Sequence, residues 1–238
     1  MMEELAAADA IIELVGANPP EGGVRGDTGE ATMFGTYPRA YRRFMRIRDL
    51  GRLGAGEEAL ILARSLLSMI ARAMWVDWSS DKAERVDRFN RWKKRELEDD
   101  IQEAKGLQVV GFAVDLDLTD YAKQLDELGN ARAMPNDFDI LKSMDLTAFY
   151  ERVYRPGSRH LHYSLHHALD ELIRAANSGE DLPLERVDED LVAEALVVSI
   201  LTYAMLLDAA EGTVKHGLTP RVAEILANSS AFSDLGEP

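Results

Sequence analysis

Apolar residues recur at helical spacing along most of the chain. In residues 57–78 they cover most of the circumference of the expected helix, which is typical of a helix inside a protein core. Residues 191–211 contain a nearly continuous apolar stretch as well, although we expect this stretch to be far shorter than the ~20 residues that a membrane helix needs. The pattern therefore predicts two core helices and an all-α bundle.

Weaker periodic segments extend this bundle at both ends. Residues 2–15 are amphipathic and are followed by Pro19, Pro20 and several glycines, a composition typical of a linker. We therefore expect residues 1–37 to form an N-terminal helix and a linker, and residues 38–238 to form a single helical domain. Within that domain, a short helix should run from Pro38 to Gly51.

The middle of the chain alternates polar helices with breaks. A long helix should follow Ser79 or Ser80 as its N-cap, with a narrow apolar stripe on a charged surface. Residues 108–114 are rich in β-branched side chains and could form a short strand, although no second strand signal lies nearby. Shorter helices are expected over 120–129, 146–155, 158–177 and 219–230.

Composition narrows the possible functions. The 238 residues include 42 acidic and 27 basic side chains, giving a formal net charge of −15, and there is no cysteine. Disulfides, thiolate nucleophiles and iron–sulfur clusters are therefore excluded. The acidic N-terminus is unlike a signal peptide, so we expect a cytoplasmic protein with no membrane contact.

The negative charge opposes nucleic-acid binding except where basic residues are segregated. Two such basic patches exist, residues 39–52, which include Arg42 and Arg43, and residues 82–95. Either patch could guide a phosphate backbone.

A polar row interrupts the apolar helix at 57–78. Arg64, Ser68 and Arg72 are spaced four residues apart and so share one face of that helix. A buried guanidinium without a partner is costly, so these residues should meet either carboxylates or an anion-binding cleft. In one arrangement they would face a row of histidines and line a polar channel.

Four of the five histidines lie in residues 160–167. At helical spacing, His162, His166 and Asp170 share one face, while His160 belongs to a neighbouring row. This pattern is compatible with a solvated polar face, or with a metal site held by His162, His166 and Asp170.

The segment 150–162 carries the densest set of reactive groups. Ser158 can cap the helix that follows the Pro156-Gly157 break, which places His160 and His162 near the positive end of that helix. This position favours neutral imidazole, the form that a general base requires. Arg155, just before the cap, could bind an anion together with free backbone N–H groups. Alternatively, the segment is a helix corner in which Tyr150 and Tyr154 pack.

Two elements resemble a family of uncharacterised bacterial and phage helical proteins over about residues 38–175. That family has an Arg-Ser-Leu-x-Glu helix and a later Tyr-Arg-x-x-Ser-x-x-x-His element. Here these match Arg64-Ser65-Leu66, with Ser68 replacing the glutamate, and Tyr154, Arg155, Ser158 and His162.

The second element is also similar to the Arg-x4–6-His signature of HEPN (higher eukaryote and prokaryote nucleotide-binding) domains. Many HEPN domains are dimeric, metal-independent ribonucleases of toxin–antitoxin or antiviral systems. The resemblance implies a HEPN-like bundle with extra terminal helices, in which the histidine activates a ribose 2′-hydroxyl and Arg155 stabilises the phosphate. Pro156 departs from the polar residue that usually follows the arginine in these nucleases.

Three functions therefore remain open. The first is a HEPN-like protein that binds or cleaves RNA without a cofactor, as a possible homodimer, with Arg64, Ser68, Arg72, Tyr154, Arg42 and Arg43 contacting the substrate. The second is a non-catalytic adaptor that binds a protein partner through the acidic loop 178–194. The third is a metal-dependent hydrolase built on His162, His166 and Asp170.

Overall fold

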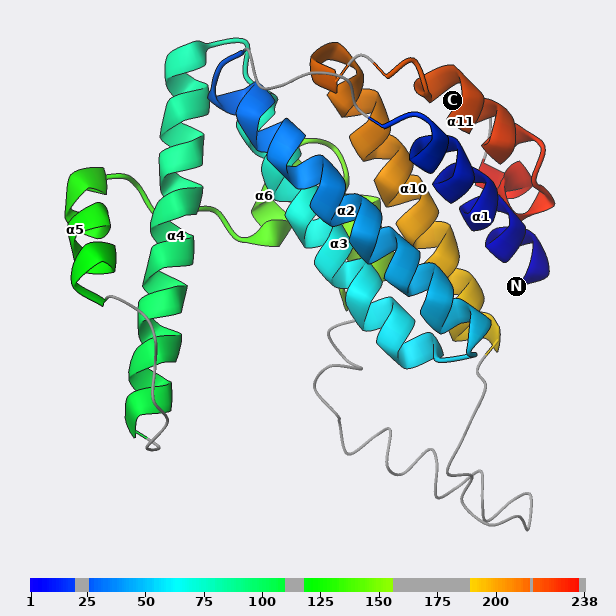
Figure 1. The fold of residues 1–238 in the computed structure, drawn as a ribbon, viewed down its shortest axis with the longest axis horizontal. Coiled ribbons are helices and arrows are strands. Elements are labelled where there is room, and N and C mark those ends of the chain that lie inside the picture. The colour runs from blue at the N-terminus through cyan, green and yellow to red at the C-terminus, as the bar shows by residue number, and fades with distance from the viewer. Residues whose placement is uncertain (20–25, 110–117, 156–188, 215, 236–238) are drawn as a thin grey trace.

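The computed structural model is a bundle of helices in which the first half of the chain packs against the last quarter (Figure 1). It describes residues 1–19, 26–109, 118–155, 189–214 and 216–235. These residues contain no strand, and the all-α class is confirmed.

The elements follow one another along the chain as helices separated by short connections. Two are not α-helical: η1 is a π-helical turn and η2 a 3-10 helix. In order they are α1 (Met2–Ala17), α2 (Thr28–Arg52), α3 (Gly56–Asp77), α4 (Lys82–Val109), α5 (Leu118–Leu128), α6 (Asp137–Ser143), α7 (Thr147–Phe149), η1 (Tyr150–Tyr154), α10 (Glu189–Val214), α11 (Thr219–Ala227) and η2 (Ser230–Leu235).

The core forms where α2, α3 and α10 pack against one another. On α10, Tyr203 is fully buried and stacks on Phe44 of α2, with 4.9 Å between the ring centroids. As predicted, residues 57–78 and 191–211 lie in core helices. In Figure 1, α1 and α11 cover one side of the bundle, whereas α4 stands at the opposite side with α5 beside it.

The linker predicted up to residue 37 is wrong over its second half. The helix α2 begins at Thr28, where the Asp27 carboxylate accepts hydrogen bonds from the backbone N–H groups of Gly29 and Glu30. Buried residues continue at helical spacing through Pro38, which lies inside the helix on its exposed side. An exposed proline costs the helix one hydrogen bond while leaving the buried face intact.

The N-terminal helix belongs to the same core. Ala8 and Ile11 of α1 are completely buried, and α1 contacts both α2 and α10. The helix is therefore integral to the bundle.

Local structure in the middle of the chain differs from expectation in two places. Gln108 and Val109, the start of the possible strand, are the last residues of α4, and residues 110–114 lie outside the described part of the chain. Asp81, rather than Ser79 or Ser80, caps α4, because its carboxylate accepts a hydrogen bond from the Ala83 N–H at 2.9 Å.

Two helices pass a length and hydropathy test for membrane spans. They are α3 and residues 189–212 of α10, with mean hydropathies of 1.5 and 1.9. The apolar run of α10 is therefore longer than the sequence analysis allowed, because the charges of this segment lie near its ends. More than half of the most apolar 18-residue window of each helix is buried in the bundle, as in the core helices of soluble proteins, so this is weak evidence for a membrane.

Three helix ends meet in one tight corner. The Arg85 guanidinium of α4 contacts the carboxylates of Asp27, at 2.6 Å, and Asp77, at 3.7 Å. Gly29 lies against them, and a Cβ atom at this position would come within 2.3 Å of an Asp77 carboxylate oxygen and 2.8 Å of the Arg85 Cδ. A larger residue at position 29 would therefore require the Asp77 and Arg85 side chains to shift.

Candidate functional site

The polar row of α3 faces α6 and η1. The Ser68 hydroxyl donates a hydrogen bond to the Asp137 carboxylate at 2.7 Å, and the Arg72 Nε atom donates to the same carboxylate at 3.0 Å. Arg72 also reaches Glu96 of α4, at 3.4 Å. Of the two alternatives left open for Arg72, the structure shows the ion pair with a carboxylate.

Asp137 was missed by the sequence analysis. It begins α6, which is capped by the Asn136 side chain, and it is only 7% exposed. Ile140 and Leu141 of the same helix are fully buried and so anchor α6 in the core. The only hint in the sequence was an Asn-Asp pair directly after Pro135, typical of a helix start.

Arg64 joins the two elements that carried the family resemblance. Its guanidinium donates a hydrogen bond to the Tyr154 hydroxyl at 3.0 Å and lies 4.3 Å from the centre of that ring. The Arg64 Nε atom is buried and has no hydrogen-bond partner among the described residues. Residues 90 positions apart in the sequence thus share one site.

An aromatic stack supports Tyr154. Its ring stacks on Tyr150, with the centroids 4.8 Å apart and the planes 15° apart, and Phe138 of α6 meets Tyr150 edge-on. The tyrosine packing predicted for a helix corner is therefore present, together with the contact to Arg64.

Arg155 follows Tyr154 directly and is accessible. Its side chain is 57% exposed and pairs with Glu151 one turn earlier, at 3.2 Å. The remaining candidates lie outside the described residues, and these are Ser158, His160, His162, His166, Asp170 and residues 178–188 of the acidic loop. Among the described residues, no group of three acidic or histidine side chains could hold a metal ion.

Ion pairs neutralise about half of the basic side chains in the two patches. In the first, Arg48 and Arg52 both pair with Asp9, and Arg43 donates to the Ser65 carbonyl at 3.1 Å. Arg42 is exposed. In the second patch, each of four arginines contacts at least one carboxylate, namely Arg85, Arg88, Arg91 and Arg95.

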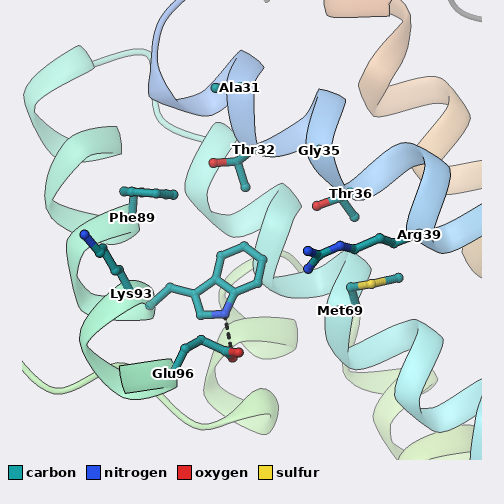
Figure 2. Close-up of a pocket in the computed structure, with 10 residues that line it drawn as sticks. Ala31, Thr32, Gly35, Thr36, Arg39, Met69, Phe89, Lys93 and Glu96 are labelled. Carbon is teal, nitrogen blue, oxygen red and sulfur yellow. Dashed lines mark hydrogen bonds between the residues drawn. The ribbon is translucent and has the colours of Figure 1, made fainter. Parts of the chain in front are cut away.

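A cavity of about 350 Å³ lies between α2, α3 and α4 and was also missed (Figure 2). Its walls combine apolar and aromatic surface with two basic side chains and one carboxylate. The signal in the sequence was the pair of aromatic residues on the otherwise polar α4. The lining residues are Ala31, Thr32, Gly35, Thr36, Arg39, Met69, Phe89, Trp92, Lys93 and Glu96.

Comparison with known proteins places the chain in a family. The model of a family of unknown function (DUF5677) matches residues 30–181, which is more than half of the chain. The chain belongs to this family. The DUF5677 match includes both Arg64-Ser65-Leu66 and the segment from Tyr154 to His162. No curated protein and no solved structure matches the chain.

Ser68, which stands where the resemblance led us to expect a glutamate, contacts a carboxylate from another helix. Ser68 holds the Asp137 carboxylate at 2.7 Å, so an acidic group from α6 lies beside the polar row of α3. Asp137 thus supplies a carboxylate beside position 68.

Proposed function

We propose that this DUF5677 protein is a HEPN-like RNA-binding protein that cleaves RNA without a metal ion, of the kind found in phage defence or toxin–antitoxin systems. The observation that carries the proposal is the contact between Arg64 and Tyr154. It brings the Arg-Ser-Leu element into contact with the residue that precedes Arg155, so that two arginines come from adjoining elements of one site.

The proposed chemistry needs one base and one cation. The His162 imidazole removes the proton from a ribose 2′-hydroxyl, and the 2′-oxygen attacks the adjacent phosphorus. The bond from phosphorus to the 5′-oxygen breaks, and that oxygen takes a proton from water. The products are a 2′,3′-cyclic phosphate and a 5′-hydroxyl, and the exposed Arg155 stabilises the charge that builds up on the phosphate.

Arg64 acts in this scheme as a positioning residue. Its guanidinium holds the Tyr154 ring from one side while Tyr150 stacks on the other. This arrangement fixes the backbone immediately before Arg155. Accurate placement of a catalytic cation matters because a small displacement lowers the reaction rate strongly.

The test is cleavage of single-stranded RNA in EDTA by the full chain and by Arg155→Ala and His162→Ala. We expect each substitution to slow cleavage by about 100-fold to 1,000-fold, as expected when one electrostatic group or general base is removed. Mass spectrometry should detect a terminal cyclic phosphate, and RNA methylated at the 2′-oxygen should resist cleavage. The control is Arg221→Ala, which removes an exposed arginine on α11.

The outcomes separate the competing functions. Absence of cleavage by the wild-type protein at high enzyme concentration would refute the nuclease and favour the adaptor that binds a protein partner. Cleavage that requires an added divalent ion would favour the hydrolase built on His162, His166 and Asp170. Arg155→Ala should retain the wild-type helicity because its side chain is mostly exposed.

A further inference from the structure

The cavity between α2, α3 and α4 has the composition of a ligand site. Phe89 and Trp92 of α4 line it, and Met69 of α3 adds an apolar surface (Figure 2). Gly35 of α2 leaves the cavity open, because a Cβ atom at this position would meet nothing within 4 Å. An aromatic surface facing an open space provides a platform on which a flat ring can stack.

Two cations at this cavity lack a carboxylate. Within the described part of the chain, neither Arg39 nor Lys93 forms an ion pair, whereas seven of the eleven other basic residues of the two patches do. Figure 2 shows the Arg39 guanidinium pointing into the cavity beside Met69. Burial and the nearby Arg39 charge lower the pKa of Arg43, as expected where positive charge is not compensated.

The single acidic residue of the cavity is already engaged. The Glu96 carboxylate accepts hydrogen bonds from the Trp92 indole N–H, at 2.9 Å, and from Arg72, at 3.4 Å. Its charge is therefore partly balanced by Arg72, and the indole ring is held in place by its own N–H. The cavity thus offers an aromatic ring beside the Arg39 guanidinium, which forms no ion pair among the described residues.

We propose that this cavity binds a nucleoside monophosphate unit, with its base against Trp92 and its phosphate against the Arg39 guanidinium. A volume of about 350 Å³ is adequate for a ligand of this size. The unit comes either from a free nucleotide or from a single-stranded nucleic acid, since both present a base joined to a phosphate. The site uses neither Arg155 nor any histidine, so it goes beyond the proposed nuclease and does not depend on it.

Isothermal titration of the full chain with AMP, adenosine and inorganic phosphate tests the composition of the ligand. We expect AMP to bind, and adenosine and phosphate alone to bind at least 10-fold more weakly, because each satisfies half of the site. Equal binding of adenosine and AMP would overturn the role of Arg39. No binding of AMP at millimolar concentration, together with no binding of an oligonucleotide, would overturn the site.

A decamer of 2′-O-methyl adenosine distinguishes the two sources and is not a substrate for the proposed cleavage. If the decamer binds and competes with AMP, the site takes a nucleotide within a strand. If AMP binds and the decamer does not, the ligand is a free nucleotide. Arg155→Ala and His162→Ala should bind AMP like the wild type. AMP binding would therefore be observed even if the protein has no nuclease activity.

Two variants locate the ligand in the cavity. Gly35→Leu fills the open space, and its helical position favours leucine over glycine, so we expect loss of AMP binding with unchanged or higher thermal stability. Arg39→Gln should lower the affinity for AMP by about 10-fold to 100-fold, because the charged hydrogen bonds to the phosphate are lost.

The matched control is Arg221→Gln, which removes an exposed arginine from α11 on the other side of the bundle and should leave AMP binding unchanged. Retention of wild-type affinity by a folded Gly35→Leu protein would show that AMP binds elsewhere and would overturn the proposal.

Discussion

The side of α3 that joins α2 and α10 is apolar, whereas the side that meets α6 and η1 carries Arg64, Ser68 and Arg72. On the first side, stability comes from removing hydrocarbon from water, which favours contact without prescribing one geometry. On the second side, each guanidinium and hydroxyl needs an acceptor at one distance and angle. The apolar side holds the bundle together, and the polar side fixes where α6 and η1 sit on it.

The largest effect should come from the apolar side. Leu67 is completely buried, and Leu67→Ala should lower the free energy of unfolding by about 2–5 kcal/mol, through lost transfer energy and the cavity that remains. Urea denaturation followed by circular dichroism measures this change. A loss below about 1 kcal/mol would mean that the core around α3 collapses to fill the space, contrary to close packing on this side.

A smaller loss is expected from the centre of the polar side. Asp137→Asn removes the charge that holds both Ser68 and Arg72, and should cost about 1–3 kcal/mol in unfolding free energy. The control is Asp139→Asn, an exposed carboxylate two residues along α6, which should change little. If the two variants are equally stable, Arg72 finds sufficient compensation from Glu96 alone.

The contact between Arg64 and Tyr154 should be weaker still. Tyr154→Phe keeps the ring under the guanidinium and removes the hydroxyl acceptor, whereas Arg64→Gln removes the positive charge. A double-mutant cycle should give a coupling of about 0.5–1.5 kcal/mol for one exchanged hydrogen bond at a half-buried arginine. A coupling near zero would show that the two residues are neighbours without energetic linkage.

The contrast between the two sides also explains what could be predicted from the sequence. Residues 57–78 and 191–211 could be assigned to the core because burial of long apolar helices does not depend on a particular partner. The need of Arg72 for a carboxylate could be predicted too, but Asp137 could not be identified, because the seven residues of α6 give about two turns of periodicity. The cavity depends on how three helices are placed, which no local pattern encodes.

The start of α2 at Thr28 could not be predicted from the sequence for a different reason. Glycines at 26, 29 and 35 and the proline at 38 have the composition of a linker. The structure uses Gly29 for close approach and leaves Gly35 facing the cavity. Tertiary contacts of this kind override local propensity, whereas the buried spacing through Met33, Tyr37 and Phe44 was the better guide.

The smallest effect should be a pH dependence at the far end of α10. Burial lowers the pKa of His216 although Glu211 lies 2.8 Å away and favours the protonated form. The unfolded chain therefore binds a proton more readily, and the stability from this group is present above the unfolded value of 6.5 and declines as the pH falls below it. Thermal unfolding between pH 5 and 8 should show a shallower decline for His216→Gln than for the wild type.

The corner formed by Gly29, Asp27, Asp77 and Arg85 links the start of α2 to the helix that lines the cavity. Arg85 forms ion pairs with Asp27 and Asp77. The aromatic wall of the cavity lies on the same helix, one or two turns further along. A methyl group at position 29 would displace the Asp77 carboxylate and the Arg85 side chain, and so disturb the ion pairs that hold the start of α4. Gly29→Ala therefore offers a way to perturb the helix that carries the aromatic wall without altering any group that lines the cavity.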